Sequence, residues 1–209
     1  MFSHLPARRP LLAGFAALCL ALVAGLAALP ARADGATPDD FIRKVGGQTL
    51  SALSDRKLTA EKREDLVRDL LTNYLDLDAV GRFCLGRYSR SLNDSQKQEY
   101  GKLFEDYLVK VYAQLLSQYN GETMTVRDGS RPAGNDMLVD SQINRQDGPP
   151  IRVEWKLHDK NGKPLLTDVI VEGVSMAFTQ RQQFESVIQN NGGKVDALLA
   201  AMKKQISKR

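Results

Sequence analysis

The chain has 209 residues, of which 43% are hydrophobic and 26% charged, so it is long enough for one domain with a substantial apolar core. Its formal net charge is +4, but three of its 29 basic residues and none of its 25 acidic residues lie within residues 1–33, a segment that we expect to be removed. The remaining 26 basic and 25 acidic side chains nearly balance, which argues against nucleic acid or another polyanion as a partner held by bulk electrostatics.

Residues 1–33 have the pattern of a secretory signal peptide. Arg8 and Arg9 precede the apolar stretch 11–29, and the stretch leads to Ala31-Arg32-Ala33, the small-x-small motif of a signal peptidase site. An uncleaved membrane anchor is the alternative, because the stretch is nearly long enough to cross a bilayer. The cleavage motif favours removal, so we expect a mature protein that works outside the cytoplasm.

The mature chain, residues 34–209, is expected to form a single domain. Cys84 is its sole cysteine, so no intramolecular disulfide can form even in an oxidising compartment. Stability must therefore come from packing, and nothing in the sequence demands more than a monomer.

Helices are predicted through the first part of the mature chain. Thr37 and Thr59 are suitable caps for the first two, and a short third helix covers 77–84. The fourth, about 94–119, begins with a capping box at Asn93 and carries apolar residues on one stripe along about seven turns.

The hydrophobic period then changes from 3.6 to 2, which is typical of strands. Alternating patterns predict four strands, around 124–126, 137–143, 151–157 and 165–174, and Asn161-Gly162 is a hairpin signal between the last two. Short connections between them predict a mainly antiparallel meander.

Two helices are predicted to close the chain. Thr179 with Gln182 resembles a capping box for the first, and apolar residues from Val195 to Ile206 form the stripe of the second. Helices, then a sheet, then helices indicate an α+β domain, with a layer of helices packed on one face of a curved four-stranded sheet.

Catalytic and metal-binding groups are sparse in the mature chain. His158 and Cys84 are the sole residues of their types, which is too few for the usual zinc sites, and no Gly-rich phosphate loop occurs. Asp168 and Glu172, four apart on one predicted strand, could act as an acid and a base, or could simply belong to a solvated face. We therefore predict no enzyme, cofactor or metal.

The motif around Ser175 resembles the site of a catalytic nucleophile. Ser175 lies in Gly173-Val-Ser-Met-Ala177, between a strand and a helix, like the nucleophile of an α/β-hydrolase. Ala177 replaces the final glycine, and His158 lies upstream of the serine rather than downstream. A lipid hydrolase that uses Ser175 remains an alternative hypothesis.

Three segments resemble the MlaC family, also known as toluene-tolerance or phospholipid-binding, ABC transporter-associated proteins. These are residues 168–189, with the blocks DVIVEGVSM and QRQQFESVIQ; residues 75–88, with LDLDAVGRF and LGRY; and residues 104–108, FEDYL. The resemblance extends in order over essentially all of residues 38–206.

The resemblance implies an NTF2-like arrangement of helices around a curved sheet and a periplasmic carrier of glycerophospholipid. Such a carrier would exchange lipid with an inner-membrane ABC transporter and an outer-membrane lipoprotein complex. Some relatives are associated with hopanoid synthesis, so a carrier of hopanoid, a polycyclic lipid, is an alternative.

We expect a tail pocket between the long helix and the sheet, although an ordinary close-packed core would show the same periodicity. The lipid-binding candidates are Tyr107, Leu108, Val111, Leu115, Met124, Val126, Met137, Val139, Val153, Trp155, Val169 and Val171. Arg82, Arg87 and Arg181 are candidates for headgroup or partner contacts, or are ordinary surface residues. A helper protein that binds partners and carries no lipid is a further alternative.

Overall fold

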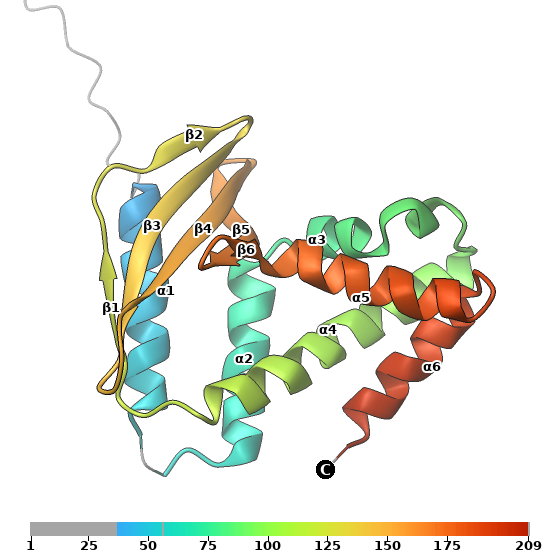
Figure 1. The fold of residues 1–209 in the computed structure, drawn as a ribbon, viewed down its shortest axis with the longest axis horizontal. Coiled ribbons are helices and arrows are strands. Elements are labelled where there is room, and N and C mark those ends of the chain that lie inside the picture. Colours follow the sequence, from blue (N-terminus) through green and yellow to red (C-terminus); the bar gives the residue numbers. More distant parts are fainter. Residues whose placement is uncertain (1–36, 56, 209) are drawn as a thin grey trace, which may run out of the picture. The chain divides into compact units, whose positions relative to one another are not determined.

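The structure is a computed structural model that describes residues 37–55 and 57–208 (Figure 1). The predicted signal peptide, residues 1–33, lies outside the described residues. Among the residues that are described, no helix combines the length and the hydropathy needed to cross a membrane.

The helices that precede the sheet begin close to the residues that the sequence predicts. Thr37 forms a capping box, Thr59 accepts a hydrogen bond from the Lys62 N–H, and Asn93 forms a second capping box with Gln96. The helices are α1 (Pro38–Leu53), α2 (Ala60–Tyr74), α3 (Leu77–Leu85), the 3₁₀-helix η1 (Gly86–Arg90), α4 (Asp94–Leu116), α5 (Met176–Asn190) and α6 (Val195–Ile206).

Six strands within the described residues form a single antiparallel sheet, which confirms the α+β class. They are β1 (Thr123–Val126), β2 (Arg131–Ala133), β3 (Asp136–Asn144), β4 (Ile151–Lys160), β5 (Lys163–Val171) and β6 (Val174–Ser175). Their order is β1-β3-β4-β5-β6, with β2 also paired to β3. The prediction of four strands missed β2 and β6, which have three and two residues and are too short to show a period.

Two tight turns shape the β4–β6 region. Asn161 and Gly162 both have positive φ, 58° and 81°, and connect β4 to β5 as predicted. Glu172 and Gly173, with φ of 48° and 81°, reverse the chain again, so that β6 pairs with the end of β5. The expectation that Asp168 and Glu172 lie on one continuous strand is therefore wrong.

The same turn moves the start of α5. Ser175 is the N-cap, and its Oγ accepts a hydrogen bond from the Phe178 N–H at 3.0 Å. Thr179 lies inside the helix, where its hydroxyl donates to the Ser175 carbonyl at 2.8 Å. The predicted capping box at Thr179 is wrong, because the preceding strand ends earlier than its apolar residues indicate.

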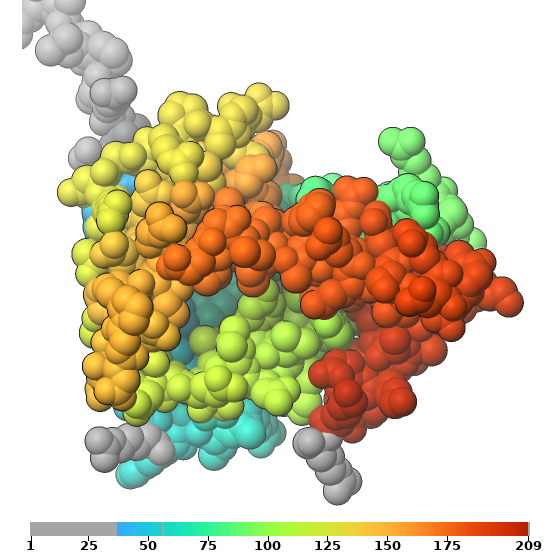
Figure 2. Space-filling model, viewed as in Figure 1, coloured from blue at the N-terminus to red at the C-terminus, as the bar shows by residue number. Residues whose placement is uncertain are grey.

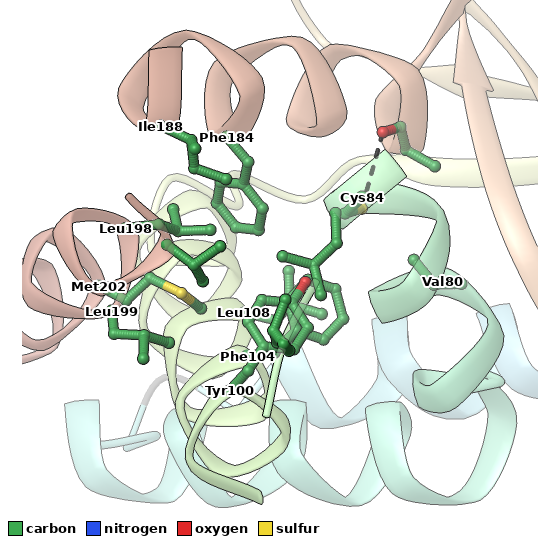
Figure 3. Packing of buried hydrophobic residues seen from close by; sticks show 14 residues of the cluster. Val80, Cys84, Tyr100, Phe104, Leu108, Phe184, Ile188, Leu198, Leu199 and Met202 are labelled. Carbon is green, nitrogen blue, oxygen red and sulfur yellow. Dashed lines mark hydrogen bonds between the residues drawn. The ribbon is translucent and has the colours of Figure 1, made fainter. Parts of the chain in front are cut away.

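The larger of the hydrophobic clusters, which we call the helical core, joins α3, α4, α5 and α6 (Figure 3). Phe104 lies 5.4 Å from Tyr100 and 6.3 Å from Phe184, measured between ring centroids. The buried members are Val80, Cys84, Leu85, Leu92, Tyr100, Phe104, Leu108, Ala177, Phe184, Ile188, Val195, Leu198, Leu199 and Met202.

A second cluster, the sheet core, lies where α1 and α2 pack on the sheet. Its buried residues are Ile42, Val139, Leu157 and Leu166. Gly46 lets α1 approach β1 closely, because a Cβ at this position would collide with the Met124 methyl group. α1 and α2 therefore pack on the sheet around this cluster, α3 and α5 also contact β5, and α4 packs mainly on α2 and α6.

Candidate functional site

All eight lipid-binding candidates in the strands share one face of the sheet, which we call the inner face. The register pairs Val139 with Trp155 and Trp155 with Val169, and Val153 with Val171. Directly paired residues point to the same side of a sheet, as do residues two apart on one strand. The eight are Met124, Val126, Met137, Val139, Val153, Trp155, Val169 and Val171.

Burial divides these eight residues into two groups. Val139 and Val153 are buried, at 0% and 5% exposure, so they pack against the protein's own side chains. The other six remain partly exposed although they are apolar and lie on the inner face. Two of the six, Met124 and Val126, border a crevice of about 330 Å³ between α1 and the edge strand β1.

Trp155 is fixed on the inner face by a polar contact. Its indole N–H donates to Ser141 Oγ at 2.8 Å, and the Ser141 hydroxyl donates to the Val153 carbonyl at 3.2 Å. Ser141 is 3% exposed, so this pair satisfies two polar groups in an apolar setting. Ser141 is not among the predicted site residues, although its position two residues after Val139 puts it on the same face.

The four candidates on α4 have different surroundings. Leu108 is buried in the helical core, and Tyr107 packs its ring 5.7 Å from Phe184. Tyr107 and Val111 are partly exposed, and Leu115 is 56% exposed. Of these four candidates, Leu108 therefore lies in the helical core, whereas Val111 and Leu115 are more exposed.

A hollow opens between the sheet, α4 and α5. Figure 2 shows it bounded by the golden strands β3 and β4, the lime-coloured second half of α4 and the orange start of α5. The teal α2 is visible at its floor. Because α1 and α2 pack on the inner face, the hollow lies on the inner side of the sheet.

A separate cleft of about 460 Å³ lies between α3 and the polar side of β4 and β5. Lys156 pairs with Asp136 at 2.9 Å, and Lys160 pairs with Asp76 at 3.1 Å. Burial raises the pKa of both carboxyl groups, but their hydrogen bonds outweigh it and the net shift of each pKa is downward. The cleft therefore combines two ion pairs with apolar groups from Ala79, Val80 and Phe83.

The three candidate arginines lie on α3, η1 and α5. Arg82 lines the polar cleft, and Arg87 donates to the Tyr88 hydroxyl at 3.0 Å. The Arg181 guanidinium bonds Glu185 at 3.0 Å and lies 5.5 Å from the centre of the Phe83 ring. Their contact with a headgroup or partner stays a prediction.

The residues of the hydrolase hypothesis have structural partners. The Ser175 hydroxyl donates to Asp168, and the same Asp168 accepts from the Ala177 N–H at 3.0 Å. His158 Nδ1 is 3.0 Å from Asp136, and no hydrogen bond joins His158 to Ser175 among the described residues. Within residues 37–55 and 57–208, no cluster of His, Cys, Asp and Glu suits a metal ion.

Comparison with known proteins identifies the family. A model of the MlaC protein family matches residues 43–204. The chain belongs to the MlaC family. This MlaC-family chain is 26% identical to the toluene tolerance protein ttg2D of Pseudomonas putida over 180 residues, which cover 82% of each protein. It is 24% identical to the intermembrane phospholipid transport system binding protein MlaC of Haemophilus influenzae, over 68% of this chain and 67% of that one.

The fold also matches a solved structure. The phospholipid-binding protein from Ralstonia solanacearum, solved in complex with a phospholipid, aligns with a TM-score of 0.70 and 21% identity. The alignment covers 79% of this chain and 94% of the other. The two proteins share the fold.

Proposed function

We propose that this protein is a periplasmic phospholipid carrier. After removal of residues 1–33, it would hold the acyl chains of one phospholipid in the hollow. It would carry the lipid between the outer and inner membranes as the soluble component of an ABC-type transport system, with an inner-membrane transporter and an outer-membrane lipoprotein complex as partners.

The observation that carries the proposal is the apolar lining that stays accessible. Met137, Trp155, Val169 and Val171 remain partly exposed on the inner face, the side of the sheet on which the hollow opens. Burial of each CH₂ group stabilises a fold by about 0.8 kcal/mol, so a domain normally buries apolar side chains of this size. A guest hydrocarbon would bury them.

The same physics explains why a lipid needs such a protein. Transfer of a sixteen-carbon acyl chain into water costs on the order of 12 kcal/mol of free energy. A phospholipid without a carrier therefore leaves a membrane very slowly. A carrier lowers that cost by offering the tail an apolar environment. Transfer then requires no covalent step.

The test is to identify what the protein carries. The full chain is expressed in a host that exports it, purified from the periplasm, and analysed by native mass spectrometry and by lipid extraction. We expect a protein population heavier by the mass of one phospholipid, and a phospholipid in the extract. A polycyclic triterpenoid instead would favour the hopanoid carrier.

Two other outcomes would contradict the proposal. A protein that carries no lipid, and takes none from phospholipid vesicles, would favour the helper that binds only partners. Lipid hydrolysis that Ser175→Ala abolishes would favour the hydrolase. A Thr179→Ala variant, which removes a nearby hydroxyl, controls for damage to the start of α5.

A further inference from the structure

Three large apolar side chains are exposed on neighbouring elements of the surface. Phe83 on α3, Val174 on β6 and Phe178 on α5 are 43%, 53% and 49% exposed. Within the described residues, Leu115 is the one other large apolar side chain that is exposed to this degree. Single exposed apolar residues are common, whereas a group of them usually marks a surface that binds something.

Contacts between α3 and α5 bring the three side chains together. The Arg181 guanidinium on α5 lies 5.5 Å from the centre of the Phe83 ring. Phe178 is three residues before Arg181 on the same helix, so the two side chains are neighbours on its surface. Val174 directly precedes Ser175, the N-cap of α5. Phe83, Val174 and Phe178 therefore form one surface, which we call the exposed patch.

The segment that contributes Phe83 is strongly basic. Residues 77–90 contain three arginines and a single acidic residue, Asp78, whereas the mature chain as a whole has an excess of one basic residue. Arg82 and Arg87 are both exposed. Arg87 donates its hydrogen bond to the neutral Tyr88 hydroxyl, which leaves its positive charge uncompensated by that contact.

Two further observations put these arginines beside the exposed patch. Arg87 follows Gly86, where a Cβ would lie 2.8 Å from Arg181 Nε, so the start of η1 lies directly against α5. Arg82 precedes Phe83, and both residues line the polar cleft. Positive charge and exposed apolar surface are therefore combined on one part of the molecule.

The start of α5 belongs both to the exposed patch and to the border of the hollow. Phe178 lies on the first turn of this helix, and Figure 2 shows the orange start of α5 at the edge of the hollow. A lipid bilayer in contact with the patch would therefore be close to the proposed cargo space. It also has the matching chemistry, because it offers hydrocarbon beneath its headgroups to apolar side chains and phosphate groups to guanidinium groups.

We propose that the exposed patch docks the protein on a membrane surface that contains anionic glycerophospholipid. The proposal rests on the proposed function and deepens it, because it assigns the surface at which the cargo would be loaded or released. Phe83, Val174 and Phe178 enter the boundary between headgroups and acyl chains, and Arg82 and Arg87 bind lipid phosphates. Salt screens exposed charges, so docking weakens as the ionic strength rises.

The test measures flotation of the protein with vesicles. The exported, purified protein is mixed with vesicles of phosphatidylethanolamine that contain about one quarter phosphatidylglycerol, an anionic lipid. We expect the wild type to float with these vesicles, and to bind about tenfold more weakly when phosphatidylcholine replaces the phosphatidylglycerol. Added salt should weaken the binding to the anionic vesicles.

A double variant removes the aromatic rings of the exposed patch. Phe83→Gln combined with Phe178→Gln should weaken vesicle binding by about tenfold or more, because two apolar side chains no longer enter the bilayer. Glutamine is a good helix former, and both rings are largely exposed, so the thermal unfolding temperature should stay close to that of the wild type.

A charge reversal tests the basic part of the surface independently. Arg87→Glu should weaken vesicle binding by about fivefold or more. Lys62→Glu is the matched control, because Lys62 is also exposed but lies on the first turn of α2, at the end of that helix remote from α3. It should leave vesicle binding unchanged.

Three results would overturn the proposal. They are a wild-type protein that floats with neither kind of vesicle, undiminished binding by the double variant or by Arg87→Glu, and equal losses for Arg87→Glu and Lys62→Glu. The first of them would favour a protein partner for the exposed patch. A wild-type protein that docks on the vesicles but neither carries nor takes up lipid would instead contradict the proposed function.

Discussion

In the helical core, Tyr100, Phe104 and Phe184 are buried against one another, whereas on the inner face of the sheet Met137 and Trp155 keep part of their surface exposed. Both regions are rich in large apolar residues, but only the first is closed by the protein itself. The difference indicates that the helical core stabilises the domain, whereas the inner face is the part left open for the cargo of the proposed function. Substitutions can test this division.

The largest effect is expected in the helical core. Phe104→Ala should reduce the free energy of unfolding by about 3–5 kcal/mol, because the ring is 2% exposed and packs on two other rings. Urea denaturation measures the loss. Lipid retained per folded molecule should stay close to wild type, and a large fall in it would show that the two regions are not independent.

A substitution on the inner face should reduce the retained lipid more than it reduces the free energy of unfolding. Trp155→Ala should cost about 2 kcal/mol of stability, because the indole is only partly buried, but should lower the retained lipid several-fold. Trp155→Phe is the matched control, since it keeps apolar surface but loses the hydrogen bond to Ser141. Equal lipid content in wild type and Trp155→Ala would remove Trp155 from the binding surface.

Acid should weaken the polar side of the sheet. The pKa of Asp136 is lowered, so its contribution to stability is complete well above the ordinary value of 3.8 and is lost as the pH falls through the lower value in the folded protein. Asp136→Asn should therefore cost about 1 kcal/mol at pH 7, a small effect because of solvent screening, and almost nothing at pH 2. Urea denaturation at the two pH values gives the difference, and an equal cost at both would contradict the assignment.

The smallest effect is expected at two adjacent glycines of α1, which test how closely this helix packs on β1. Gly47→Ala should raise stability by about 0.5 kcal/mol, because a Cβ there meets no other atom and alanine favours the helix. Gly46→Ala should lack this gain, because its Cβ must displace the Met124 side chain. Thermal unfolding of the pair measures the difference, and equal gains would mean that α1 packs less closely on β1 than described.

The elements with a long period or a capping residue could be predicted from the sequence. The stripe of α4, the cap at Asn93 and the turn at Asn161-Gly162 are local signals, and the structure has all three. The start of α5 could not be found in this way, because the turn at Glu172 requires positive φ in a residue that rarely adopts it. The sequence around a glutamate does not predict that it will adopt positive φ, so the turn could not be predicted.

The candidate site was predicted in part. Alternation along the strands correctly put eight apolar residues on one face, because the period of a strand is two. It could not predict that Val139 would be buried while Trp155 stays partly exposed, since this depends on where α1 and α2 lie. Nor could it find the contact between Trp155 and Ser141, which depends on a distance across the sheet.

Cys84 has a practical consequence for the helical core. Its side chain is 1% exposed, burial raises its pKa to about 12, and its Sγ lies 3.7 Å from the Ala177 carbonyl at the start of α5. Almost no thiolate exists at neutral pH, so the sulfur is protected from oxidants and from exchange with disulfides while the helices are packed. The rate at which this thiol reacts with a maleimide therefore reports how often α3 separates from α5. The measurement requires no additional cysteine in residues 34–209.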